Sequence, residues 1–139
     1  TVEQASIPSG SFAPYQATFE ADAGDFSSAD ASLISVTRSA EDRFVVLVIE
    51  DVKGETLGGR VIVSATVYNP GPQNAEIVRV FVTLLDGSER VAGYRVVTFD
   101  GGITLDGGAR LPLSIDLASQ ALEVTPDYSL YVEARPVEQ

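Results

Sequence analysis

The feature that most constrains this chain is an alternation of apolar and other side chains with a period of two residues. It is clearest in Arg60–Tyr68, Leu111–Leu117 and Tyr128–Arg135. Successive side chains of a β-strand point to opposite faces of the sheet, so this pattern predicts half-buried strands. The helical period is nearly absent. The predicted inward-facing residues are Val61, Val63, Ala65, Val67, Leu111, Leu113, Ile115, Leu117, Tyr128, Leu130, Val132 and Ala134.

Runs rich in β-branched residues predict further strands. These are Phe44–Val52, Ala75–Leu85, Arg90–Phe99 and the short segment Ile103–Leu105. A short helical turn is expected at Leu117–Glu123. The second of these strands would place one more set of side chains on a single face, namely Val78, Val80, Val82 and Leu84.

Glycine, proline, asparagine and aspartate separate these runs and predict turns. Asn69–Pro72 ends one strand, and Asp100–Gly102 and Asp106–Gly108 bound the short segment after Phe99. Asp86–Gly87 predicts a hairpin with a type I′ turn, because this pair suits the positive φ angles of that turn. Pro112 falls on the outward set of its strand, and proline lacks the N–H that a central strand donates, so either the strand lies at a sheet edge or Pro112 is among its first residues.

About seven short strands with regularly spaced turn signals predict an all-β antiparallel sandwich, immunoglobulin-like or fibronectin type III-like, in residues 41–139. The chain contains no Cys and no Trp, so the cysteine and tryptophan core of antibody domains is missing and aliphatic residues must supply the burial. The expected core comprises Val61, Val63, Val67, Val80, Val82, Leu84, Leu113, Ile115, Leu130 and Val132.

Residues 1–40 align with the C-terminal part of the chain. Ile7–Pro14 matches Leu105–Pro112, and Ser32–Arg38 matches Ser129–Arg135. Recurring sequence at a fixed spacing indicates tandem modules. Residues 1–40 are therefore interpreted as the last strands of a preceding repeat, carried as extra N-terminal strands. The alternative is that they belong to one larger sandwich. Either way, their apolar residues are expected to pack on the complete module or on a second chain.

Residues 57–135 resemble the FxLYD family of bacterial envelope domains and, more loosely, the CARDB domains named for cell adhesion. The resemblance is carried by Val67–Gly71, Val80–Gly87, Leu105–Gly108 and Leu113–Leu117. Val82 stands where the naming motif has phenylalanine and Leu85 where it has tyrosine. The resemblance implies a secreted or cell-surface, extracytoplasmic bacterial module without general catalytic residues, often repeated.

Composition excludes several kinds of chemistry. The chain has no His and no Cys, which removes serine–histidine and cysteine–histidine nucleophilic sites and cysteine metal sites. A net charge of −11 disfavours nucleic acid and anionic lipid as partners, and no apolar run is long enough to insert into a membrane. No catalytic residue and no cofactor is therefore predicted, and the chain is not expected to be an enzyme.

Two weak binding hypotheses remain. Asp86, Asp100 and Asp106 are calcium candidates, because calcium takes several oxygen ligands from flexible loops. Their Asp-Gly contexts also suit turns, which explains them without a metal. Tyr68 and Tyr94, with Tyr131, are candidates for an aromatic platform that stacks on sugars, although alternating tyrosines are more often half-buried packing residues.

The predicted function is a structural, adhesion or spacer module. The alternative is a ligand-binding module for carbohydrate or protein, accessory to an extracellular enzyme. The expected partners are neighbouring modules of the same polypeptide, or a second copy joined by strand exchange or edge pairing, because two isolated strands are marginal in water. An exposed tyrosine cluster would favour the ligand-binding alternative, and purely charged faces would favour the spacer.

Overall fold

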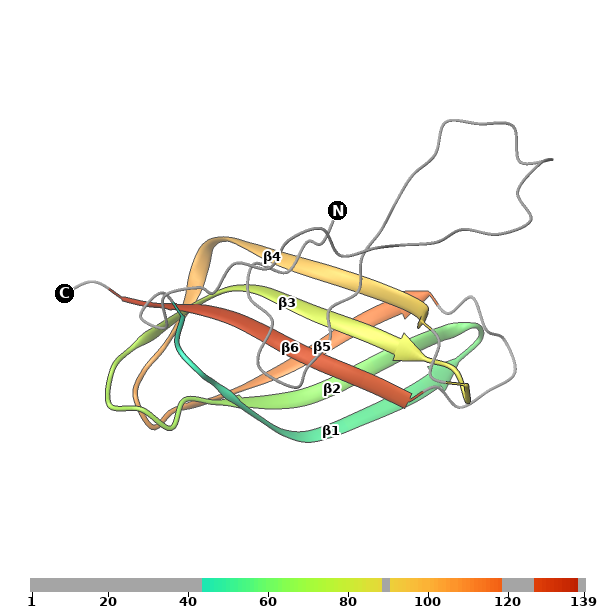
Figure 1. Ribbon diagram of the computed structural model, residues 1–139, viewed down its shortest axis with the longest axis horizontal. Coiled ribbons are helices and arrows are strands. Elements are labelled where there is room, and N and C mark those ends of the chain that lie inside the picture. Colours follow the sequence, from blue (N-terminus) through green and yellow to red (C-terminus); the bar gives the residue numbers. More distant parts are fainter. Residues whose placement is uncertain (1–43, 89–90, 119–126, 138–139) are drawn as a thin grey trace, which may run out of the picture. The chain divides into compact units, whose positions relative to one another are not determined.

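The computed structural model describes residues 44–88, 91–118 and 127–137, and within these ranges the chain is all-β (Figure 1). No helix occurs among these residues, as the missing helical period predicts. Six strands are present. They are β1 (Val48–Leu57), β2 (Arg60–Tyr68), β3 (Ala75–Leu85), β4 (Val91–Leu105), β5 (Arg110–Ala118) and β6 (Asp127–Pro136).

The strands form two antiparallel sheets of three, ordered β1-β2-β5 and β4-β3-β6. Buried side chains from both sheets form one hydrophobic cluster. The architecture is therefore β-sandwich-like, as the alternation predicts. Six strands are described where about seven were expected.

Strand β2 is the central strand of the first sheet and follows the predicted alternation throughout. Val61, Val63, Ala65 and Val67 are all buried, whereas the residues between them are half-buried. Eight of the ten expected core residues are buried, and Leu113 and Leu130 are half-buried but pack against the same cluster. The prediction of the core is confirmed, because each of these side chains removes apolar area from water.

The predicted face of β3 is wrong at Val78. Its pairing with both neighbouring strands shifts between Ile77 and Arg79, so a β-bulge lies at this position. A bulge leaves one residue unpaired and changes which side chains share a face. The core side chains before the bulge are therefore Ala75 and Ile77, and Val78 itself is half-buried.

The first strand lies further along the chain than predicted. The apolar run suggested Phe44–Val52, but β1 is Val48–Leu57 and includes the polar end of that segment. Gly58 and Gly59 have φ angles of 57° and 83°, so they close a tight turn directly into β2. Glycine adopts such angles without a steric penalty, which lets β1 pair with β2 as far as Leu57 and Arg60.

Two turn predictions also need correction. Asp100–Gly102 was expected to separate two strands, but β4 runs through it as an irregularity, with Gly101 and Gly102 at positive φ. Asp86–Gly87 does join β3 to β4, but neither residue has the positive φ angle of a type I′ turn. Instead, the Asp86 carboxylate accepts a hydrogen bond from the Ser88 amide at 2.8 Å.

The Asn69–Pro72 turn is held by the fully buried Asn69 side chain. Its amide nitrogen donates to the carbonyl oxygens of Gln73 at 2.8 Å and Leu105 at 3.1 Å. Its side-chain oxygen accepts from the Gly71 amide at 3.1 Å. Each buried polar atom of Asn69 is thereby satisfied, which removes the cost of burying it. The turn is tied to the end of β4.

Several predictions lie outside the described residues. These are the extra N-terminal strands and the repeat remnant in residues 1–40, and the part of the expected helical turn that falls in residues 119–126. Pro112 can be placed. It is the third residue of β5, and β5 pairs only with β2 among the described strands, so both positions expected for this proline fit the structure.

Candidate functional site

A pocket of about 390 Å³ lies where the edge strands β4 and β5 of the two sheets approach each other. Among the described strands, β4 and β5 each pair with one neighbour only, so each lies at the edge of its sheet as described. The described lining comprises Val91, Ala92, Gly93, Tyr94, Arg95, Asp116 and Leu117.

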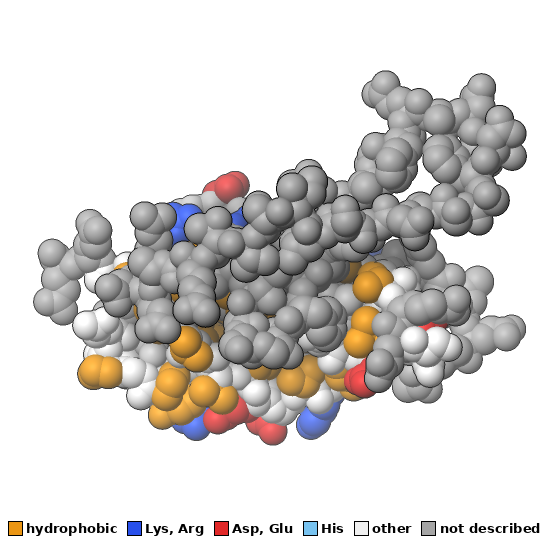
Figure 2. All heavy atoms as spheres, in the orientation of Figure 1, with side chains coloured by type: hydrophobic (Ala, Val, Ile, Leu, Met, Phe, Trp, Pro, Cys, Tyr) orange, Lys and Arg blue, Asp and Glu red, His pale blue; other side chains and the backbone are white. Residues whose placement is uncertain are grey.

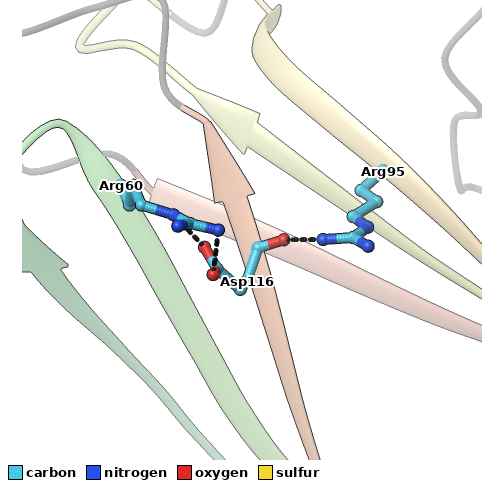
Figure 3. A network of polar contacts seen from close by, with 3 residues as sticks. All are labelled: Arg60, Arg95 and Asp116. Atoms are coloured by element: carbon cyan, nitrogen blue, oxygen red, sulfur yellow. Dashed lines mark hydrogen bonds and ion pairs between the residues drawn. The ribbon is translucent and has the colours of Figure 1, made fainter.

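Arg95 is directed toward this pocket by the register of β4. It pairs with Val82 of β3, and residues paired across strands share one face of the sheet. Because Val82 is buried in the core, Arg95 also lies on the inner face, but at the edge strand. Its guanidinium crosses to the other sheet and donates through Nη1 to the Asp116 carbonyl oxygen (Figure 3).

Asp116 contacts two arginines, one through its backbone and one through its side chain, as Figure 3 shows. Its carbonyl oxygen accepts from Arg95, and its carboxylate pairs with Arg60 of β2. The Arg60 Nε donates to Asp116 Oδ1 at 3.0 Å, and its Nη2 lies against Oδ2. Arg60 therefore neutralises the Asp116 carboxylate, and the Arg95 charge is not balanced by it.

The other ion pairs brace neighbouring strands. Arg110 of β5 donates to Glu50 of β1 at 3.0 Å, across β2. The hydrogen bond to Glu50 and its negative charge raise the pKa of Arg110 above its usual range. In the second sheet, Arg79 donates to the buried carboxylate of Glu133 at 2.6 Å. All three pairs join residues more than fifty positions apart in sequence.

The three calcium candidates are not brought together. Asp86 follows β3, Asp100 lies within β4, and Asp106 follows β4 at the end of the strand far from Asp86. Among the residues that the structure describes, no three acidic side chains are grouped to hold a metal ion. The Asp86 carboxylate serves its own turn, and the Asp106 carbonyl accepts from the Ala109 amide at 3.0 Å.

The three tyrosine candidates lie on two different surfaces. Tyr68 is on the outer face of β1-β2-β5, where the Arg110 guanidinium stacks over its ring at 4.1 Å. Tyr94 and Tyr131 belong to β4 and β6, and they pair with Thr83 and Phe81 on the outer face of the other sheet. The predicted platform of three rings is therefore not formed.

The visible face in Figure 2 shows how charges are distributed over the first sheet. Acidic and basic side chains lie beside one another along the lower rim, over β1, with hydrophobic side chains among them. Two hydrophobic residues of β1, Val48 and Leu57, are exposed. Single exposed apolar residues are normal on a folded protein and do not define a site.

Sequence reasoning missed the contact between Arg95 and Asp116. Arg95 falls within a predicted strand, but nothing in the sequence shows that its face points inward, because the pairing register with β3 decides this. The sequence signal nearest to this contact was Pro112, which suggested an edge position for β5 as one of two alternatives.

The chain matches no protein-family model, no curated protein and no solved structure in the comparisons made. The described ranges contain no helix of the length and apolarity needed to cross a membrane.

Proposed function

We propose that this chain is a non-catalytic structural, adhesion or spacer module of a bacterial secreted or surface protein. The observation that carries the proposal is how the charged side chains of the first sheet are used. Arg60–Asp116 and Arg110–Glu50 each pair side chains across strands on a solvated face. These charges brace the sheet instead of converging on a reacting group.

The hydrogen bonding of buried polar side chains supports the same proposal. Within the described ranges, no buried side-chain nitrogen or oxygen lacks a hydrogen-bond partner. Catalytic sites often hold buried ionisable groups whose environment is arranged for reaction rather than stability. The buried polar residues here have structural duties, such as Asn69 in its turn and Glu133 in its ion pair with Arg79.

We further propose that the module has an immunoglobulin-like topology. An immunoglobulin sheet pairs its first, second and fifth consecutive strands, and its third strand lies between neighbours in the second sheet. The orders β1-β2-β5 and β4-β3-β6 correspond to this scheme if β4 is the additional edge strand. A seventh strand of this scheme would lie beside β6.

The spacer role can be tested by pulling the chain between two marker domains in a force spectrometer. A load-bearing module should unfold in one discrete event that releases about 30 nm, the extended length of Val48–Pro136 at about 3.5 Å per residue. Val67→Ala should lower the unfolding force because it creates a cavity in the core. The exposed Ser114→Ala serves as the control. Gradual extension without a discrete event would contradict the spacer role.

The absence of catalysis is a separate part of the proposal. We expect the purified chain to hydrolyse neither glycosides nor esters nor peptides above the rate of buffer. A turnover that is lost on changing one carboxylate to its amide would contradict this proposal, because it would assign that carboxylate a role in the reaction.

A further inference from the structure

We propose that the pocket between β4 and β5 binds a carboxylate group of a small ligand, with the Arg95 guanidinium as its receptor. This inference goes beyond the spacer role and does not depend on it. It rests on the shape of the pocket, on the charge of Arg95 and on the contact that orients it.

The shape suits a small organic acid. The volume of about 390 Å³ is within the range of pockets that hold small ligands. Its lining includes the apolar residues Val91, Ala92 and Leu117. Such pockets use apolar walls for affinity and a few polar groups for orientation. Arg95 is the cationic group in the described lining.

The charge of Arg95 is not balanced within the described residues. Arg60, Arg79 and Arg110 each form an ion pair with a carboxylate, whereas the hydrogen bond of Arg95 goes to a backbone carbonyl. A guanidinium has five N–H donors, and the Asp116 carbonyl accepts from one nitrogen only. The remaining donors can bind the two oxygens of a carboxylate side by side.

The contact with Asp116 prepares Arg95 for this role. It orients the guanidinium of the exposed Arg95 toward β5, which reduces the side-chain entropy lost when a ligand binds. Arg60 pairs with the Asp116 carboxylate and screens it from an incoming anion. In Figure 3 the Arg60 and Arg95 side chains approach Asp116 from opposite sides. A ligand carboxylate would therefore meet a net positive site on a strongly acidic chain.

The ligand carboxylate could come from a uronic acid sugar or from the C-terminus of a peptide. Both present the same planar anion, and neutral analogues separate the sources. The full chain is titrated with galacturonate, with galactose, with trialanine and with trialanine amide, while backbone amide resonances are followed by NMR. We expect shifts at Tyr94–Arg95 and Asp116–Leu117 with one or both acids, and much weaker binding of the neutral analogues.

Two variants test the receptor itself. Arg95→Gln should weaken binding of the acid at least tenfold, because a charge-assisted pair is replaced by a neutral hydrogen bond. Arg95→Lys should bind with intermediate affinity, since it keeps the charge but loses the paired donors. Arg135→Gln is the matched control, because Arg135 is an exposed arginine of β6 that does not line the pocket in the described residues. It should leave the dissociation constant unchanged.

The outcomes decide the proposal in each case. A galacturonate response alone assigns a sugar acid, a trialanine response alone assigns a peptide terminus, and both together assign any small carboxylate. Equal binding of acids and neutral analogues overturns the proposal, as does no response to either acid. Equal affinity of Arg95→Gln and the original chain also overturns it, and melting temperatures establish that the variants remain folded.

Discussion

The outer faces of the two sheets differ in how they meet water. On β1-β2-β5 the outward residues of β2, Ile62, Ser64, Thr66 and Tyr68, are all half-buried, and the ion pairs at the two ends of the face are partly exposed. On β4-β3-β6 the outward residues Phe81, Thr83 and Glu133 are only 2%, 3% and 1% exposed. The first face is therefore solvated along its central strand. The second face is dry only around Phe81, Thr83 and Glu133, because outward residues on its flanking strands, such as Tyr94 and Thr98, are half-buried or exposed.

This difference shows that alternation does not by itself say which face is buried. In β3, all five residues from Val80 to Leu84 are buried, although every second side chain points away from the core. The Phe81 ring is accompanied by Tyr131 at 5.9 Å between centroids and by the Arg79 guanidinium at 5.5 Å. The outer face of the second sheet thus carries an aromatic cluster around Phe81 with one ion pair, whereas the outer face of the first sheet carries a mixture of polar and charged side chains.

The largest effect should come from truncating the aromatic residue of the dry face. Phe81→Ala should lower the free energy of unfolding by about 3 to 5 kcal/mol, because it removes a fully buried ring. Tyr68→Ala on the solvated face is the matched aromatic control, and we expect at most about 2 kcal/mol there. Urea unfolding measures both. Equal losses would mean that the two outer faces are energetically alike.

The ion pairs provide the next comparison. Arg79→Gln removes the partner of a buried carboxylate, Glu133, and should cost about 3 kcal/mol. Arg60→Gln removes the partner of a partly exposed carboxylate and should cost less than about 1 kcal/mol. The same urea experiment ranks the two variants. If Arg60→Gln were the more damaging, burial of the pair would not be what determines its contribution.

A smaller effect is expected where a residue of the second sheet contacts the first. The Tyr128 hydroxyl accepts a hydrogen bond from the Gly54 amide at 2.8 Å. A Cβ atom added at Gly54 would lie 2.5 Å from the Tyr128 ring, so Gly54→Ala should displace the ring and cost about 2 kcal/mol. Gly87→Ala, where a Cβ meets nothing within 4 Å, is the control. Similar melting temperatures for both variants would show that the ring moves freely.

The smallest effect concerns pH on the solvated face. The pKa of Arg110 is raised by Glu50, so the stability from this pair is fully present below the ordinary arginine pKa and is lost only above the raised value. Between about pH 7 and pH 10 the arginine stays charged in both folded and unfolded chains. Arg110→Gln should therefore change the melting temperature equally at both pH values. A change that grew toward pH 10 would contradict this assignment.

Much of the fold followed from residues close together in sequence. The bounds of β2 and β3 were predicted correctly because β-branched runs end at strong turn signals, such as Asn69–Pro72. Pro112 suggested an edge strand or a position near the start of its strand, because it cannot donate a ladder hydrogen bond, and β5 has both features among the described strands. The candidate site was not predictable in this way, since Arg95 and Asp116 are twenty-one positions apart and meet only across two sheets.

The sequence by itself determined the all-β class, the inward residues of β2, β5 and β6, and the turn at Asn69–Pro72 that ends β2, because side-chain alternation and backbone limits are local properties. Only the tertiary structure decided the bulge at Val78, the dry outer face around Phe81 and the inward position of Arg95. These depend on the register between strands distant in sequence, and a shift of one residue in register moves every side chain to the opposite face.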